Sequence, residues 1–244
     1  IDGTAPNHPE LWKYSKIEGG YKFTSKQGSV EIQMKPWHVK IYDAKGKLLT
    51  GTLHDTDFKN TYTPTLPFSY VRRNSDYSRS MGAAFSLEPD EKIFGCGESF
   101  TQFNKRGQKV VLWTDDANGI QNETMYKPIP FYLSSRGYGV FMHHSTPITV
   151  DFGKYYASAN EMYIGDDEPD LFFFIGEPKE VLDEYTNLTG KAAMPPLWSF
   201  GFWMSRITYF TEKEGREVAK NLRAYKIPIF DDLITIFIIL IYFS

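Results

Sequence analysis

Between residues 21 and about 175, hydrophobic and polar residues follow the pattern of many short β-strands. Val30, Ile32 and Met34 alternate with polar neighbours, which is the two-residue period of a strand with one buried face. Other apolar runs, separated by turn residues, lie at 38–43, 130–133, 139–142, 148–152 and 171–175. Because almost no helical period appears before residue 178, the pattern predicts a mainly β fold, an antiparallel β-sandwich.

A helix is predicted directly after the last of these runs. Residues 178–188 place four apolar side chains at helical spacing on one stripe: Val181, Leu182, Tyr185 and Leu188. Pro178 stands at the start and Gly190 just past the end, where each residue type is favourable. Residues 191–196 end in two consecutive prolines and are expected to form a stiff linker. We therefore predict a sandwich domain over 1–190 and a second unit over 191–244.

Beyond the linker the chain has the pattern of an α/β unit. A buried strand is predicted over 198–204, and Thr211 and Glu214 have the spacing of a capping box that opens a helix. The apolar stripe of this helix consists of Val218, Ala219, Leu222 and Tyr225. Another apolar run follows Pro228, which completes a strand–helix–strand unit of the kind that (β/α)₈ barrels repeat. One unit cannot close a barrel, so we predict only the first βα unit of a truncated (β/α)₈ barrel.

Residues 229–244 form an atypical apolar tail. Within it, residues 233–243 are all Leu, Ile, Phe or Tyr except for one Thr. This run is shorter than the roughly 20 apolar residues that a membrane-spanning helix needs, so no membrane partner is expected. Its β-branched and aromatic residues favour a strand, and an uncovered strand of this kind promotes association and low solubility.

Composition and charge narrow the function classes. A net charge of -3 without a basic cluster gives no field for binding nucleic acid. The aromatic share of 16% suits an antiparallel sheet and also suits the stacking of sugar rings. Cys96 is the single cysteine, which excludes an internal disulfide and leaves the redox compartment open. The chain begins with Ile rather than Met, so cytoplasmic and exported (periplasmic or secreted) locations both stay open.

Three segments of the sequence form motifs that can be compared with those of known protein families. The first is 93–100, which reads IFGCGESF. The second begins as WTDD at 113–116 and continues as YKPIPFY at 126–132 and RGYGV at 136–140. The third is MPPLWSFGFW at 194–203. In order and spacing these segments resemble glycoside hydrolase family 31, particularly its α-xylosidase branch, and the resemblance spans roughly residues 21–228.

The resemblance implies a galactose-mutarotase-like sandwich followed by a catalytic barrel, in a retaining α-glycosidase that hydrolyses O-glycosyl bonds. Retaining hydrolysis uses two carboxyl groups about 5 Å apart. In the family both are aspartates of barrel loops that lie further on than residue 244, and this sequence departs from the family pattern after Pro228. We therefore assign no catalytic residue, cofactor or metal to this chain and expect it to be inactive alone. The expected partner is an α-linked oligosaccharide or glycoside, and homo-oligomerisation of the full-length enzyme stays open.

The resemblance also implies candidate sugar-binding residues. The family extends a sandwich loop over the barrel mouth, where an Asp accepts hydrogen bonds from sugar hydroxyls; Asp116 fits this position best and Asp115 second. A carboxylate suits the role because it accepts two hydroxyl donors at once, although a plain turn residue is the alternative. Trp113 either stacks on a sugar face or belongs to the core. Tyr209, which follows the first predicted barrel strand, is expected to be a pocket aromatic.

Two other features have structural explanations. The segment Gly95-Cys96-Gly97 lacks the Lys-Ser/Thr end of a phosphate loop, so its glycines are expected to permit a tight backbone path, with Glu98 capping the turn. The adjacent histidines at 143 and 144 lack the sequence context of metal ligands.

Two rival functions are a non-catalytic carbohydrate-binding sandwich module and a mutarotase-like enzyme using His143 or His144 with a strand Glu. The segment 198–203, which leads into a capped helix, favours the glycosidase because a free-standing sandwich has no need of it.

Overall fold

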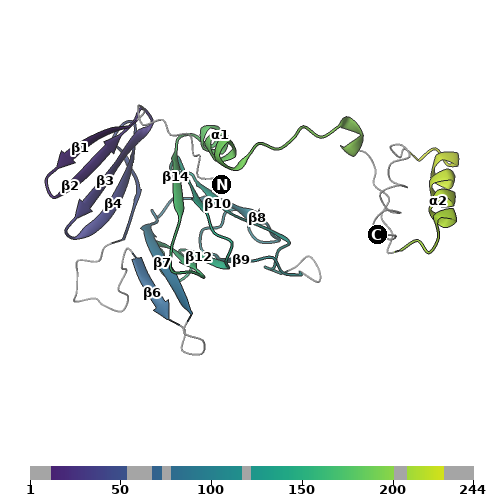
Figure 1. Ribbon diagram of the computed structural model, residues 1–244, viewed down its shortest axis with the longest axis horizontal. Helices are drawn as coiled ribbons and strands as arrows, with labels where there is room; N and C mark the ends of the chain where they lie inside the picture. Colours follow the sequence, from purple (N-terminus) through teal and green to yellow (C-terminus); the bar gives the residue numbers. More distant parts are fainter. Residues whose placement is uncertain (1–11, 54–67, 73–77, 117–121, 201–207, 228–244) are drawn as a thin grey trace. The chain divides into compact units, whose positions relative to one another are not determined.

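The computed structural model describes residues 12–53, 68–72, 78–116, 122–200 and 208–227. Contacts within the chain divide it into two compact units, Ile1–Gly190 and Lys191–Ser244. In the first unit the described residues form three antiparallel sheets and one helix, so the predicted mainly β sandwich is confirmed (Figure 1).

The order of strands within each sheet follows from hydrogen-bonded antiparallel pairing. The first sheet runs β1 (Lys13–Ile17), β2 (Gly20–Thr24), β3 (Gly28–Met34), β4 (Trp37–Asp43) and β5 (Leu48–Gly51). The second runs β14 (Leu171–Ile175), β11 (Tyr138–Met142), β10 (Lys127–Ser134) and β8 (Ile93–Glu98). The third runs β6 (Phe68–Arg72), β7 (Arg79–Ser86), β13 (Ala159–Ile164), β12 (Ile148–Phe152) and β9 (Lys109–Leu112).

The main core lies between the second and third sheets. The rings of Tyr132 and Phe152, one from each sheet, have centroids 5.1 Å apart, and both side chains are fully buried. Phe85 and Phe173 make a second contact across the same interface, with centroids 5.2 Å apart. Large aromatic side chains remove much apolar surface from water, so these contacts stabilise the packing of the second sheet on the third.

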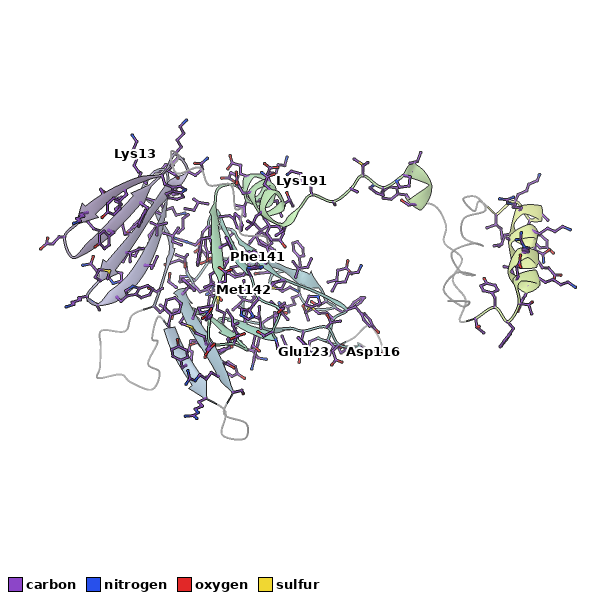
Figure 2. All side chains as sticks on the ribbon, viewed as in Figure 1. Lys13, Asp116, Glu123, Phe141, Met142 and Lys191 are labelled. Atoms are coloured by element: carbon purple, nitrogen blue, oxygen red, sulfur yellow. The ribbon has the colours of Figure 1, made fainter. Side chains whose placement is uncertain are left out.

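Helix α1 (Pro178–Thr189) covers the outer face of the second sheet. Strand β11 shows how that sheet is buried on both faces: Met142 points into the main core, whereas Phe141 packs toward α1 (Figure 2). Val181 of the helix is 1% exposed against this layer, and the ring of Tyr185 stacks on that of Phe131 at 4.0 Å. A strand between two apolar layers needs no polar face, which explains the continuous apolar run of β14.

The predicted helix at 178–188 is confirmed, with one correction. Pro178 occupies the first turn, and the Glu180 carboxylate accepts a hydrogen bond of 2.8 Å from the Glu177 backbone N–H. Leu182, which the stripe placed on the buried face, is 43% exposed. It follows Val181 by one residue, about 100° around the helix, so it points away from the sheet.

The first sheet joins the sandwich along β5. The Thr50 hydroxyl donates to the carbonyl of Ser86 at 3.1 Å, and the Leu53 N–H donates to the carbonyl of Ala84 at 2.9 Å. Strand β1 at the outer edge of this sheet was not predicted because its five residues, KYSKI, are mostly polar and exposed. Its strand conformation comes from pairing with β2 rather than from burial.

In the second unit the described residues contain a 3₁₀ helix at Leu197–Phe200 and the helix α2 (Glu212–Ala224). The predicted strand over 198–204 is therefore wrong for its first three residues, and 201–207 lie outside the described residues. A local turn explains the difference, because the Ser199 N–H and hydroxyl both donate to the Pro196 carbonyl, at 3.0 and 2.7 Å. The strand predicted after Pro228 and the apolar tail also lie outside the described residues.

Helix α2 begins where the sequence predicts. The Thr211 hydroxyl accepts from the Glu214 N–H at 3.2 Å, but the Glu214 carboxylate accepts from the Phe210 N–H instead of closing the box on Thr211. No residue of α2 is buried, and Tyr225 is 79% exposed. Within the described ranges, no helix combines the length and apolar character required to cross a bilayer.

Candidate functional site

The predicted sugar-binding loop follows β9. Thr114 bridges to Met125 in parallel, and the Asp115 N–H donates to the Met125 carbonyl at 3.2 Å, so the segments on either side of 117–121 run side by side. The Asp116 N–H donates to the Asp115 carboxylate at 2.9 Å, and the Tyr126 hydroxyl donates to the Asp116 carboxylate. In Figure 2 Asp116 lies at the end of the sandwich far from β1, close to Glu123.

The side chains of this loop face solvent. Asp115 and Asp116 are both exposed, and Trp113 is 50% exposed. A half-exposed indole is not a core residue, so of the two predicted roles of Trp113 only sugar stacking is left as a prediction. The structure thus gathers Trp113, Asp115 and Asp116 on one loop. Tyr209 belongs to the second unit, where it is half-buried just before α2.

A cavity of about 550 Å³ adjoins the loop. Its lining comes from the end of β8, the segment after it and the residues that lead into β10: Gly95, Gly97, Glu98, Ser99, Phe100, Thr101, Phe103, Lys105, Thr124, Met125, Tyr126 and Lys127. Phe100, Phe103 and Tyr126 are 70%, 81% and 61% exposed and give the cavity an aromatic rim. Tyr126, whose hydroxyl donates to the Asp116 carboxylate, lines the cavity, whereas Asp116 itself does not belong to the lining.

Lys105 is a cavity residue that the sequence analysis missed. It is 5% exposed, and its ammonium donates to the hydroxyls of Thr101 at 2.6 Å and Ser99 at 3.3 Å. Burial lowers the pKa of Lys105 below its usual range, because a charged ammonium loses hydration there. Cys96 lies nearby, and burial raises the pKa of its thiol to about 12. In the sequence Lys105 belongs to a polar Asn-Lys-Arg-Gly segment that looks like an exposed turn, and nothing local signals its burial.

The Gly95-Cys96-Gly97 segment borders the same cavity. All three residues have positive φ, and a Cβ on Gly97 would lie 2.0 Å from the Lys127 carbonyl oxygen, so the predicted tight backbone path is confirmed. The prediction that Glu98 caps a turn is wrong. Glu98 ends β8 directly opposite Lys127, and the two exposed side chains form an ion pair of 3.6 Å across the strands.

The two histidines each face a different aspartate. The Nδ1 atom of His143 is 2.8 Å from the Asp170 carboxylate, and the Nε2 atom of His144 is 3.6 Å from the Asp166 carboxylate. The described part of the chain holds no group of three or more His, Cys, Asp or Glu side chains suited to a metal ion.

Comparison with known proteins decides the family. Residues 2–151 match the glycosyl hydrolase 31 N-terminal galactose mutarotase-like domain. This chain belongs to glycoside hydrolase family 31. Residues 192–234 match the family 31 TIM-barrel domain, so the family 31 chain contains the start of the barrel after its sandwich.

Relatives of the family 31 chain include proteins named as α-xylosidases and as a dextranase. It is 35% identical over 210 residues to the α-xylosidase XylQ of Lactiplantibacillus pentosus, covering 78% of this chain and 27% of the relative. The glucose-complexed GH31 dextranase of Flavobacterium johnsoniae superposes with a TM-score of 0.74 at 26% identity, covering 89% and 25%. A GH31 α-xylosidase from a soil metagenome, complexed with xylose, has the same TM-score at 23% identity and the same fold, covering 89% and 32%. The chain thus spans about a quarter to a third of the length of these relatives.

Proposed function

We propose that the chain forms the sandwich and barrel start of a retaining α-glycosidase of the α-xylosidase type, with Asp116 accepting hydrogen bonds from sugar hydroxyls. Family membership and the relatives' names support the reaction class. The observation that carries the role of Asp116 is its setting: an exposed carboxylate that accepts a hydrogen bond from Tyr126, a residue that lines an aromatic-rimmed cavity.

The surroundings of Asp116 suit a binding residue better than a turn residue. The bridge between Thr114 and Met125 fixes the backbone before it, and the Tyr126 hydroxyl restrains its side chain. A carboxylate has about four lone-pair sites, so it accepts sugar hydroxyls in addition to a neighbouring phenol. A carboxylate restrained in advance loses less conformational entropy when a sugar binds.

The remaining predicted site residues have supporting roles in this proposal. Trp113 offers an exposed indole for stacking on a pyranose face, and Asp115 positions the loop through its bond to the Asp116 N–H. Tyr209 is proposed as the pocket aromatic supplied by the barrel start.

Catalysis in this proposal belongs to barrel loops of a longer protein. Retaining hydrolysis requires a nucleophile and an acid/base carboxyl group about 5 Å apart, and we assign neither to the 244 residues. The purified chain alone is therefore expected to leave p-nitrophenyl α-xyloside intact. Release of p-nitrophenol above background by a contaminant-free preparation would show that the chain carries its own carboxylate pair.

The alternative function, a non-catalytic carbohydrate-binding module, has less support. Residues 192–234, which match the family 31 TIM-barrel domain, directly follow the sandwich, and a binding module requires no such segment.

The test substitutes Asp116, Tyr126 and Glu123 one at a time in a full-length protein that contains this chain. Asp116→Ala should lower kcat/KM on p-nitrophenyl α-xyloside by roughly ten- to a hundredfold, because one or two charge-assisted hydrogen bonds of about 1.5–3 kcal/mol in total are lost. Tyr126→Phe should cause a smaller loss, because it removes one restraint on the Asp116 carboxylate but keeps the carboxylate itself. Glu123→Ala is the matched control, since it removes an exposed negative charge at the same end of the sandwich.

Thermal unfolding separates binding from folding in this test. All three variants should melt near the parent protein, because the side chains of Asp116, Glu123 and Tyr126 are exposed. A sharp drop in the melting temperature of Asp116→Ala, with unchanged kinetics per folded molecule, would make Asp116 structural and refute its proposed role.

A further inference from the structure

A second pocket lies on the outer face of the third sheet. It has a volume of about 330 Å³ and is lined by Lys109, Thr149, Asp151, Tyr155, Tyr156, Glu161 and Tyr163. It shares no lining residue with the cavity beside Asp116. The size is near the lower end of the roughly 300–1,000 Å³ of small-molecule sites, which suits a single ring.

Antiparallel register builds this pocket from three strands. Asp151 of β12 lies directly opposite Glu161 of β13 on one side and Lys109 of β9 on the other. Thr149 lies opposite Tyr163. Directly opposed residues share a face of the sheet, so these five side chains lie together on the face that points away from the core.

Asp151 is the feature that points to a ligand. It is 3% exposed, and one carboxylate oxygen accepts from the backbone N–H groups of Lys154 at 2.6 Å and Tyr155 at 3.4 Å. Its other oxygen, Oδ2, is buried without a hydrogen-bond partner among the described residues. A buried carboxylate oxygen without a donor is costly, and in folded proteins most buried polar atoms have partners. A ligand that brings a hydroxyl or N–H donor would satisfy it.

The charged groups around Asp151 indicate the charge and the hydrogen-bonding groups of a suitable ligand. Glu161 adds a second carboxylate, and burial together with the charge of Asp151 raises the pKa of Glu161. Lys109 holds its ammonium 5.9 Å from the centre of the Tyr155 ring. A neutral ligand with several hydroxyl groups can donate to the two carboxylates and accept from the ammonium of Lys109 without adding charge to the pocket.

Three tyrosine rings give the pocket an apolar surface on which a ligand can stack. Tyr155, Tyr156 and Tyr163 are 66%, 39% and 37% exposed around the acids. Exposed rings beside carboxylates match a ligand with an apolar C–H face and polar edges. We propose that this pocket is an accessory binding site for one neutral pyranose ring, with hydroxyls donating to Asp151 Oδ2 and Glu161 and a sugar face on a tyrosine.

The test uses the complete 244-residue chain and saturation-transfer NMR with methyl α-D-xylopyranoside and methyl α-D-glucopyranoside. The parent chain should show transfer to at least one glycoside. Glu161→Gln and Tyr155→Ala should each weaken that binding at least tenfold. Tyr70→Ala is the matched control, because Tyr70 is 64% exposed on β6 of the same sheet and does not line the pocket; it should leave binding unchanged.

Further outcomes separate this site from the one at Asp116. Transfer that persists in both pocket variants and disappears in Asp116→Ala would overturn the accessory site while supporting the proposed function. Loss in the pocket variants but not in Asp116→Ala supports the accessory site, whatever the protein's activity. Absence of transfer to either glycoside, or displacement of the glycoside by tetramethylammonium or calcium, would also overturn it. Circular dichroism of each variant checks folding. If Tyr155→Ala does not fold, the result for Glu161→Gln, which keeps the side-chain size, decides the test.

Discussion

The two α-helices within the described residues show what packing adds to a helical sequence. Helices α1 and α2 are similar in length, with 12 and 13 residues, and both start at a capped N-terminus. Helix α1 buries Val181 to 1% exposure on the second sheet, whereas α2 has no buried residue. The difference lies in the surface beneath each helix rather than in local sequence signals. An apolar stripe and a cap are enough to form a helix, but stabilisation comes from the layer that the stripe covers.

The largest expected effect is at the buried polar centre of the first unit. Glu91 is 1% exposed, and its carboxylate accepts from the Ser134 hydroxyl at 2.5 Å, the Tyr138 hydroxyl at 2.6 Å and the Glu88 N–H at 3.0 Å. Glu91→Ala removes this acceptor from the buried hydroxyls of Ser134 and Tyr138. It should lower the free energy of unfolding by about 3 kcal/mol or more, measured by urea unfolding.

Asp90→Ala is the control for Glu91→Ala. It removes the neighbouring carboxylate in the same turn, which is exposed, and should change the free energy of unfolding by less than about 0.5 kcal/mol. Equal, small effects of both variants would mean that the stability of the first unit does not depend on this buried polar centre.

The second prediction compares positions on the helices themselves. Val181→Ala on α1 should cost about 2 kcal/mol, because it leaves a cavity against Phe131 and Phe141. Leu182→Ala removes more atoms from the same helix but from its 43% exposed side, and should cost less than about 0.5 kcal/mol. Val218→Ala on α2 should be equally mild. Chemical denaturation gives all three values, and a cost for Val218→Ala that matches Val181→Ala would show that α2 is covered as α1 is.

The smallest expected effect is that of removing the second unit. A chain ending at Gly190 keeps every residue of the main core and of the layer under α1. Its denaturation midpoint should therefore equal that of the sandwich in the complete chain. Light scattering should also show fewer large particles, because the apolar run at 233–243 is gone. A lower midpoint for the shorter chain would mean that the second unit stabilises the sandwich.

Much of the fold could be predicted from local pattern. Strands β3, β12 and β14 lie where the apolar periods place them, and α1 starts at Pro178. Strand β1 could not be predicted in this way, since its residues are mostly polar and exposed and only pairing with β2 defines it. Burial of alternate residues leaves a period in the sequence, whereas backbone pairing at an exposed edge leaves none.

Less of the candidate site could be predicted. The family resemblance indicates the loop of Asp116, but its bond to Tyr126 joins residues ten apart across a loop. The burial of Lys105 has no local signal. Asp151 and Glu161 carry no motif in the sequence, and only register places them opposite each other. Pockets join side chains from several strands, so their composition depends on pairing that one segment does not encode.

The sequence by itself determined the alternating strands, the capped helices and the tight Gly95-Cys96-Gly97 path, because these depend on near neighbours and on backbone sterics. Tertiary structure alone decided which face of each element is covered. It buries Phe141 under α1, exposes Trp113 and Leu182, and leaves one oxygen of Asp151 without a donor. The physical reason is that burial and desolvation are set by residues distant in the chain, which meet only when the sheets pack.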